Sequence, residues 1–301
     1  MVTFIFIFNM GWRIIDIEQG QQVKLFLNNL IILKDLKKIT IPLCDIGTIV
    51  FDNTRTIITI RLINELTKNN ILVIVCDEKH LPSSLIIPQI GNFNSLKILE
   101  KQINWDAKFK HSKWKEIIIH KILNQIEILK YFKLKFNQTF FEQMIAEIQP
   151  FDLTNREGHA AKVYWHILFG NQFSRNLENN INRMLNYGYS ILYSYFSRSI
   201  VKKGLDPRIS IFHKSFNNYF ALSSDLMEEF RPLIDWYVYK TNQSKDDILI
   251  VDIKTNILRL FSQKCMIVDK RYFIPQAIDI YIDNLINERE MPKVNFLYDE
   301  Y

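Results

Sequence analysis

The chain has 301 residues, 48% of them hydrophobic, which is enough to fill the cores of two domains and excludes a disordered protein. Its three cysteines are far apart and odd in number, so the composition argues against a disulfide framework or a zinc cluster, and we expect buried thiols. The net charge is +6, and the surplus is concentrated between residues 96 and 136, where ten lysines occur with only four acids. This local excess favours the binding of a polyanion.

No apolar run approaches the roughly 20 residues that span a bilayer. The N-terminal TFIFIF is short and lacks both the basic segment and the small-residue cleavage site of a signal peptide. We therefore expect a cytoplasmic protein without a membrane segment.

Short β-branched runs fill residues 12–53 and are separated by glycine, asparagine and proline. They predict an antiparallel sheet or a sandwich. A helix is expected over about 56–68, followed by a buried strand over 71–78 and a last strand at SSLIIPQ. Together these elements predict a β-sandwich-like N-terminal domain over residues 1–90.

The strand pattern stops between His80 and Asn94, where two prolines and a glycine cluster. Beyond this point apolar residues recur at helical spacing, over residues 105–135, 154–169, 178–203, 225–240, 244–262 and 272–289. The fold class is therefore α+β, and an all-α domain over residues 91–301 follows the β-rich one.

Four lysines near the start of the first long helix are candidates for contacts with DNA phosphates: Lys108, Lys110, Lys113 and Lys115. A solvated helix face is the alternative, but the excess of positive charge in this segment favours a phosphate-binding role. The aromatic residues among them, such as Trp105 and Trp114, pack inward more often than they stack on bases.

Carboxylates occur at two predicted helix starts. In FDLTNREGHAA, Thr154 can cap a helix that has Glu157 at its third position. In SSDLMEEFRP, Asp225 can cap a helix with Glu228 completing a capping box, beside Glu229. The same oxygens can instead hold a divalent metal over a phosphodiester. Each cap is ordinary, so the spacing leaves both interpretations open.

His213 ends the segment GLDPRISIFH, a connection marked by glycine and proline, fifteen residues before Glu228. A loop histidine and a helix-start carboxylate can converge, although a histidine bonded among aromatic neighbours is the alternative. One imidazole with carboxylates suits Mg²⁺ or Mn²⁺ better than zinc, and such a site suits phosphoryl transfer. No glycine-rich phosphate loop or nucleophile elbow suggests another chemistry.

Five segments occur in order along the chain: GWRIID, NREGHAA, LNYGYSILYS, GLDPRISIFH and DLMEEFRPLID. Together they resemble the CRISPR-associated integrase of spacer acquisition, the first core protein of that system, with the closest likeness to its type II branch. The resemblance implies an N-terminal β-rich dimerisation domain joined to a helical catalytic domain. It also implies that Mg²⁺ or Mn²⁺ is bound by Glu157, His213 and Glu228. It makes Asp225 an auxiliary acid and Tyr193 an aromatic residue near the active site.

The resemblance implies a reaction in which the 3′-hydroxyl of a captured DNA fragment attacks a phosphodiester at the repeat boundary of a CRISPR array. The implied partners are double-stranded DNA, a second copy of the chain and a small dimeric second core adaptation protein, which together form a heterohexamer. Type II systems add an effector nuclease and a ring-shaped DNA-end-binding protein. The alternative function is a non-catalytic DNA-binding architectural scaffold. Residues Met1–Asn9 precede the family's usual start.

Overall fold

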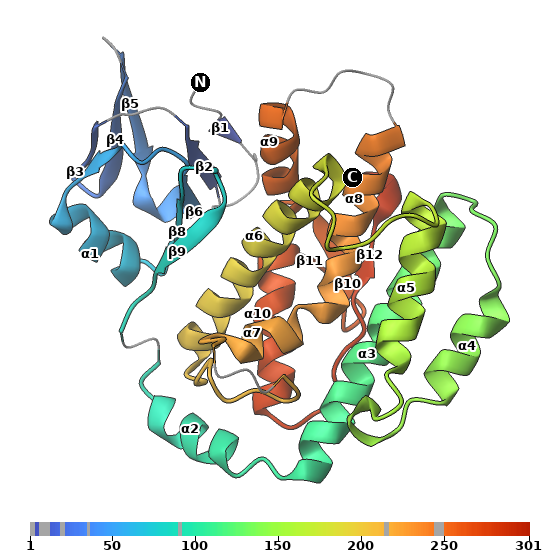
Figure 1. Cartoon of the computed structure of the whole chain (residues 1–301). Coiled ribbons are helices and arrows are strands. Elements are labelled where there is room, and N and C mark those ends of the chain that lie inside the picture. The colour runs from blue at the N-terminus through green and yellow to red at the C-terminus, as the bar shows by residue number, and fades with distance from the viewer. Residues whose placement is uncertain are drawn as a thin grey trace.

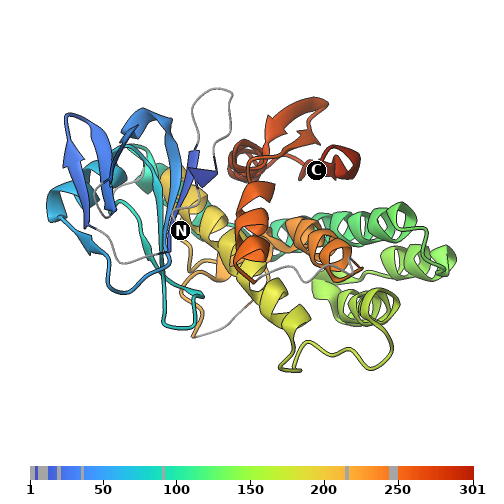
Figure 2. The same ribbon diagram turned by 90° about the horizontal axis from the view of Figure 1, so that it is seen from above.

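The computed structural model describes residues 4–5, 13–18, 22–34, 37–89, 92–213, 217–243 and 250–301. Apart from Phe4–Ile5, the segment that precedes the family's usual start lies outside these residues. Figure 1 shows the N-terminal strands with α1 at one end of the molecule, and the other helices, with the strands β10 to β12 among them, over the rest. From above, Figure 2 shows the long helix α6 between the N-terminal strands and the helices α3 to α5. The predicted α+β class, with strands first and helices after them, is confirmed.

The N-terminal region contains two sheets. One has the strand order β1 (Phe4–Ile5), β2 (Arg13–Ile17), β6 (Ile46–Phe51), β8 (Leu72–Cys76) and β9 (Pro82–Ile86). The other has the order β5 (Lys37–Pro42), β4 (Asn29–Lys34), β3 (Gln22–Phe26) and β7 (Ile57–Ile58). Strand β6 runs parallel to both β2 and β8, so the expected antiparallel arrangement is wrong here. The chain makes two crossovers that parallel strands require: strands β3 to β5 connect β2 to β6, and helix α1 (Ile60–Lys68) lies in the connection from β6 to β8.

The five-stranded sheet is covered on both faces. Ile15 of β2 and Val73 of β8 pack with the second sheet and α1. Ile14, Leu72 and Ile74 pack instead with the helical region. Successive residues of a strand point to opposite faces, so each strand contributes to two cores. This double burial explains why β8 is a continuous apolar run.

The helical region contains α2 (Ser95–Ile103), α3 (Ala107–Tyr131), α4 (Gln138–Ala146), α5 (Arg156–Phe169), α6 (Asn180–Lys203), α7 (Ala221–Leu226), α8 (Arg231–Gln243), α9 (Ile250–Leu260) and α10 (Ile274–Ile286). Single 3₁₀ turns are η1 (Leu43–Asp45), η2 (Pro150–Asp152), η3 (Glu228–Phe230) and η4 (Tyr298–Glu300). Helix α6 contacts β8 and β9 as well as α8, α9 and α10. Gly188 permits its close approach to α8, because a Cβ there would lie 2.4 Å from Ile234 Cγ2. The sequence did not predict α2 and α4, whose short length gives a weak periodic signal.

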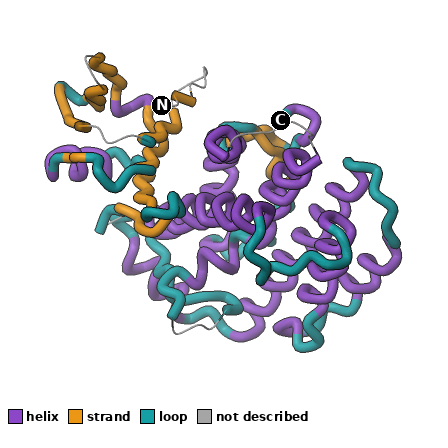
Figure 3. Tube along the Cα trace, turned by 45° about the horizontal axis from the view of Figure 1, so that its top comes forward, coloured by secondary structure: helices purple, strands orange, loops and turns teal. Residues whose placement is uncertain are grey.

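A small sheet adds strands to the predicted all-α domain, in the order β11 (Lys270–Phe273), β10 (Lys264–Ile267) and β12 (Asn295–Phe296). Figure 3 shows these strands among helices, apart from the N-terminal sheets. The turn between β10 and β11 holds Val268 and Asp269 at φ of 49° and 58°. A β-branched residue disfavours that conformation, so the turn carries no hairpin signal in the sequence. None of the described helices is long and apolar enough to cross a membrane.

Candidate active site

Helix α3 carries a lysine into the core of the helical region. Its first turn is capped by Asp106, whose side chain accepts a hydrogen bond from the N–H of Phe109 at 2.7 Å. Trp114 and Ile118 are buried on one face of the helix. Lys121 lies on the same face, and only 8% of its side chain is exposed. A buried ammonium group requires anions beside it, so acids must reach Lys121 from other elements.

The start of α5 brings the first of these acids. Asp152 accepts hydrogen bonds from the backbone N–H groups of Arg156 at 2.7 Å and Glu157 at 2.9 Å. Asp152 therefore caps this helix, and the prediction that Thr154 caps it is wrong. The carboxylate of Glu157, in the first helical turn, accepts a hydrogen bond from Lys121 Nζ.

A tight turn sets the direction in which the chain enters α5. Asn155 has a φ of 51°, a left-handed conformation that asparagine tolerates better than most residues. Its side chain lies against Gly158, where a Cβ would be 2.5 Å from Asn155 Oδ1. The asparagine and glycine of NREG thus fit the turn that presents the intervening glutamate.

Asp225 does not cap a helix. It lies inside α7, is fully buried, and accepts hydrogen bonds from the N–H groups of Ile211 at 2.7 Å, Phe212 at 2.8 Å and His213 at 3.1 Å. The predicted capping box with Glu228 is therefore wrong, because α7 has already begun before Asp225. The carboxylate instead fixes the backbone of the loop that carries the histidine.

The ring of His213 is held by the same carboxylate. Its Nδ1–H donates to Asp225 Oδ1 at 2.5 Å, which leaves the Nε2 lone pair for another ligand. Trp114 meets the ring edge-on at 5.4 Å between ring centroids and stacks on Phe212 at 4.2 Å. The hydrogen bond to Asp225 raises the pKa of His213, against the lowering effect of partial burial. With 44% of the side chain exposed, the imidazole is accessible to a ligand.

Glu228 comes from a break in the helix that was expected over 225–240. The turn η3 separates α7 from α8 and begins at Glu228. Its Oε2 accepts a hydrogen bond from Lys121 Nζ at 2.6 Å, and its Oε1 pairs with Arg231 Nε at 2.9 Å. Burial would raise the pKa of Glu228, but Arg231 and Lys121 outweigh burial and lower it. The group is therefore an anion at neutral pH.

The neighbouring Glu229 has a structural role. It accepts a hydrogen bond from the N–H of Val294 at 2.6 Å and pairs with His120 Nδ1 at 3.2 Å. These contacts fasten the C-terminal segment to α3. Of the three acids in SSDLMEEFRP, only Glu228 meets Lys121.

Glu157 and Glu228 thus share one ammonium group, and Glu228 interacts with the charge that His213 carries when its imidazole is protonated. Within the described ranges, no three histidine, cysteine or acidic side chains lie close enough together to hold a metal ion. The donor chemistry nevertheless fits Mg²⁺ or Mn²⁺, because two carboxylates and one free imidazole nitrogen are available. Lys121 Nζ occupies the position of a cation between the carboxylates, so a metal shared by Glu157 and Glu228 requires this ammonium group to move aside.

Comparison with known proteins identifies the family. The family model described as CRISPR associated protein Cas1 matches residues 15–247. The chain belongs to the Cas1 family. A relative from Neisseria meningitidis serogroup C, described as a CRISPR-associated endonuclease Cas1, is 31% identical over 273 residues, which are 90% of each protein. A similarly described protein from Saccharolobus solfataricus is 29% identical over 209 residues, which are 63% of this chain and 58% of that protein.

Solved structures share the fold of this Cas1-family chain. A casposase bound to an integration product has a TM-score of 0.72 and 19% identity, over 93% of this chain and 92% of that one. A Cas1 protein from Thermotoga maritima has a TM-score of 0.70 and 19% identity, over 91% of this chain and 96% of that one. A chain of a Cas6-RT-Cas1–Cas2 complex has a TM-score of 0.69 and 18% identity, over 95% of this chain and 36% of that one. The resemblance to the integrase family seen in five sequence segments is confirmed at the level of family and fold.

The lysines predicted to bind DNA do not share one environment. Lys108 is exposed, whereas Lys110 and Lys115 are partly buried. Lys113 is buried, pairs with an acid on its own helix and donates a hydrogen bond to the carbonyl of Arg289 at 2.8 Å. Lys113 therefore joins α3 to the C-terminal segment, and its charge does not point to solvent.

Tyr193 lies on α6 beside the loop that follows His213. Its hydroxyl donates a hydrogen bond to Asn218 Oδ1 at 3.2 Å, and its ring meets Phe220 edge-on. Burial raises the pKa of Tyr193 to about 12, so the hydroxyl keeps its proton at neutral pH. These contacts hold the side chain against the segment that joins His213 to α7.

Sequence reasoning missed two cations of the site, Lys121 and Arg231. The signal for Lys121 was its position, because it follows Trp114 by seven residues and Ile117 by four, on the apolar stripe of α3. A lysine on such a stripe needs a buried acid. Arg231 follows Glu228 by three residues, the spacing of a helical ion pair.

Proposed function

We propose that this chain is a metal-dependent DNA endonuclease and integrase that inserts new DNA into a CRISPR array. The family match and the endonuclease description of the Neisseria relative support the coarse assignment. The casposase with the same fold is bound to an integration product, which supports strand transfer as the reaction class. The observation that carries the proposal is the meeting of Glu157 and Glu228 at one cation position, with His213 within electrostatic range of Glu228.

In the proposed reaction, the 3′-oxygen of the incoming DNA forms a bond to a phosphorus atom at the repeat boundary. The bond from that phosphorus to the 3′-oxygen of the array breaks, the attacking hydroxyl loses a proton and the leaving oxygen gains one. One phosphodiester replaces another, so no nucleotide cofactor is consumed. A bound Mg²⁺ or Mn²⁺ would neutralise charge on the phosphate and favour ionisation of the attacking hydroxyl.

The side chains have separate tasks in this proposal. Glu157, Glu228 and His213 would hold the metal through carboxylate oxygens and Nε2. Asp225 orients the imidazole and keeps the proton on Nδ1. Arg231 restrains Glu228 by pairing with its second oxygen, which limits the rotation of that carboxylate.

The proposal extends to partners. We expect the chain to act as a homodimer on double-stranded DNA and to form a heterohexamer with a small dimeric second core adaptation protein. The similar structures named as Cas1–Cas2 complexes and as a casposase with an integration product support these partners. Two further partners, a type II effector nuclease and a ring-shaped DNA-end-binding protein, are proposed from the sequence resemblance alone.

The test is an integration assay with a supercoiled plasmid that carries the repeat, short DNA duplexes and the small partner protein. Integration should require Mn²⁺ or Mg²⁺ and stop when a chelator is added. Glu157→Gln and Glu228→Gln should remove integration, whereas Glu142→Gln should not, because Glu142 is an exposed residue of α4. Integration in the presence of chelator, or wild-type rates for both site variants, would overturn the proposal.

A DNA-binding architectural scaffold is the second candidate function. The observation in its favour is that Lys121 already neutralises Glu157 and Glu228. A scaffold would need these carboxylates only for folding, so the glutamine variants would still support integration catalysed by another subunit. If the glutamine variants retain integration and bind DNA as the wild type does, the result favours the scaffold function.

A further inference from the structure

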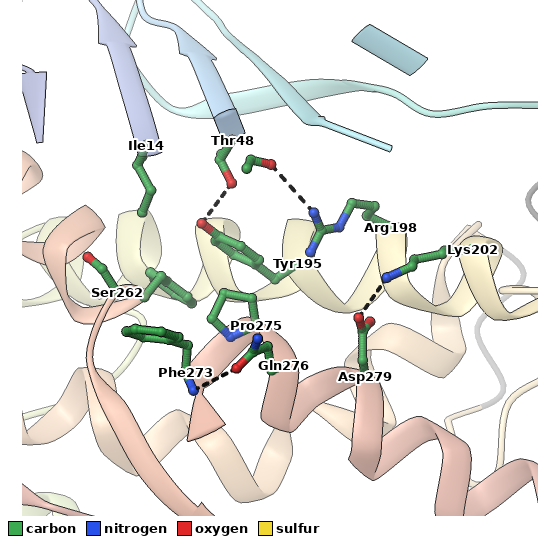
Figure 4. Close-up of a pocket in the computed structure, with 12 residues that line it drawn as sticks. Ile14, Thr48, Tyr195, Arg198, Lys202, Ser262, Phe273, Pro275, Gln276 and Asp279 are labelled. Carbon is green, nitrogen blue, oxygen red and sulfur yellow. Dashed lines mark hydrogen bonds and ion pairs between the residues drawn. The ribbon is translucent and has the colours of Figure 1, made fainter. Parts of the chain in front are cut away.

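A pocket of about 210 Å³ lies where the N-terminal strands meet the helical region (Figure 4). Its lining residues come from β2 and β6 on one side and from α6, β11 and α10 on the other. None of them belongs to the candidate active site. A ligand bound here would therefore contact both halves of the chain.

One wall of the pocket is aromatic and apolar. The rings of Tyr195 and Phe261 are stacked, with centroids 4.5 Å apart and an interplanar angle of 7°. The hydroxyl of Tyr195 is hydrogen-bonded to Thr48 Oγ1 at 2.8 Å, which fixes the ring against β6. Ile14 and Phe273 complete this wall. The guanidinium carbon of Arg198 lies over the Tyr195 ring, 5.6 Å from its centroid, so the apolar wall and the cation face the same space.

The polar end of the pocket is Arg198, which is only 5% exposed. Its Nη1 makes two long hydrogen bonds, to the carbonyls of Gly47 at 3.5 Å and Asn70 at 3.4 Å. Its Nε has no hydrogen-bond partner within the part of the chain that the structure describes. Figure 4 shows the guanidinium turned toward the space beside Tyr195 and Thr48. Apart from its contact with the ring of Tyr195, this buried cation therefore has only weak hydrogen-bond partners among the described residues.

The acid nearest to Arg198 in the pocket is already engaged. Asp279 pairs with Lys202 at 2.7 Å and accepts a hydrogen bond from Ser199. No carboxylate among the described residues lies within 4.0 Å of the guanidinium nitrogens of Arg198. The negative charge of Asp279 is neutralised by the positive charge of Lys202, so the charge of Arg198 remains without a counter-charge among the pocket residues that the structure describes. Burial of that charge lowers the pKa of Arg198, and an anion in the pocket would compensate it.

We propose that this pocket binds a small anion carried on one planar apolar ring, such as an aromatic carboxylate, and that the ligand holds the N-terminal sheets on α6. The carboxylate meets Arg198, and the ring packs on Tyr195 and Phe261. The volume sets the size of the ligand. A cavity of about 150 Å³ admits benzene, whereas drug-sized ligands need about 300 Å³ or more. A mononucleotide, with about 20 non-hydrogen atoms, is too large for the pocket.

The test uses 4-fluorobenzoate, with neutral 4-fluorobenzamide as its matched control. Fluorine NMR of the full-length protein should show line broadening for the benzoate and not for the amide. The benzoate should also raise the Tm by at least about 2 °C at saturation, because it binds only the folded state. Equal binding of both compounds, or binding of neither, overturns the proposal.

Two variants locate the binding. Arg198→Met removes the charge and keeps the length of the side chain, and it should abolish both signals. Ile14→Phe keeps every charge and extends the side chain that Figure 4 shows pointing into the pocket, so it should also block the benzoate. Ile14→Phe decides the question if Arg198→Met does not fold. Arg208→Met, at an exposed arginine, should leave both signals unchanged. Unchanged broadening in Ile14→Phe places the benzoate elsewhere and contradicts the proposal.

Discussion

Two buried acids of this chain are held in opposite ways. Glu228 has a cation at each carboxylate oxygen, and its pKa is lowered. Among the described residues, neither side-chain oxygen of Asp16 in β2 has a hydrogen-bond partner, and burial, together with the charge of Asp52, raises its pKa to about 8. One carboxyl group is therefore ionised at neutral pH and the other is protonated. The two acids differ because an element distant in the sequence brings a hydrogen-bonded counter-charge to Glu228 and, within the described part of the chain, none to Asp16. A local sequence pattern cannot predict these contacts.

Replacing Lys121 by methionine separates metal binding from folding. Lys121→Met should lower the free energy of unfolding by about 3 kcal/mol, because Glu157 and Glu228 lose their shared counter-charge. Mn²⁺ should then raise the Tm more in the variant than in the wild type, since the metal no longer competes with an ammonium group. Thermal unfolding with and without Mn²⁺ measures both effects. Lys130→Met, at an exposed lysine of the same helix, is the control. Equal Mn²⁺ shifts in variant and wild type would count against a shared cation position.

Asp16→Asn tests the neutral buried acid. The folded pKa of Asp16 is about 8 and its unfolded pKa is about 3.9, so the folded state binds the proton more tightly. Its contribution to stability is complete below about pH 4 and is lost as pH rises to about 8. Asparagine does not ionise, so the variant should be more stable than wild type by about 5 kcal/mol at about pH 9 and should gain nothing at about pH 4, because each pKa unit corresponds to about 1.4 kcal/mol. Urea unfolding across this range measures the difference, with exposed Asp299→Asn as control. A difference in stability between variant and wild type that does not change with pH would contradict a raised pKa of Asp16.

At the level of elements, long helices were predictable and their interruptions were not. Helices α3, α5 and α6 carry apolar residues at helical spacing over most of their length, and their existence was predicted from it. The break at Glu228 is hidden because Leu226, Phe230 and Leu233 continue the periodic pattern through it. The motifs NREG and GLDPRISIFH pointed to Glu157 and His213. Lys121 could not be paired with them from the sequence, because this contact joins residues far apart in the chain.

The start of α5 offers a direct comparison of two possible caps. Asp152→Ala should lower the free energy of unfolding by about 1–2 kcal/mol, because the N–H groups of Arg156 and Glu157 lose their acceptor. Thr154→Ala should change it by less than about 0.5 kcal/mol, since Thr154 is exposed and is not the cap. Urea unfolding of both variants measures the difference. A larger loss of stability for Thr154→Ala than for Asp152→Ala would show that Thr154 is the cap, as expected from the sequence.

Lysines in the first turns of α3 that are not fully buried are predicted to bind DNA. The triple change Lys108→Glu, Lys110→Glu and Lys115→Glu should weaken binding to every DNA sequence and flatten its dependence on salt, because phosphate contacts release counterions. Lys113→Met should reduce stability and leave the salt dependence unchanged, since this lysine is buried and bonded to the protein. Fluorescence anisotropy with the isolated protein over a range of salt concentrations measures both. Unchanged affinity of the triple variant at low salt would return these lysines to a solvated helix face.

At the scale of the whole molecule, the N-terminal strands and the helices share one hydrophobic cluster. Ile14, Leu72 and Ile74 of the five-stranded sheet belong to the same cluster as Tyr195 and Phe196 of α6. The hydrogen bond between Tyr195 and Thr48 crosses the same junction. The strand-rich region thus has one core between its two sheets and α1, and a second face of its larger sheet lies in the cluster that it shares with the helices.

Limited proteolysis tests this organisation. The first cut should fall between His80 and Asn94, where the chain leaves β9 and has not yet entered α2. The two fragments should nevertheless elute together on gel filtration, because their separation would expose apolar surface at about 25 cal/mol per Å². The fragment 1–90 produced alone should lack cooperative unfolding, since one face of its larger sheet has lost its cover. The uncut protein on the same column is the control. First cuts within residues 154–235 would contradict the boundary, and a folded, monomeric fragment 1–90 would contradict the shared core.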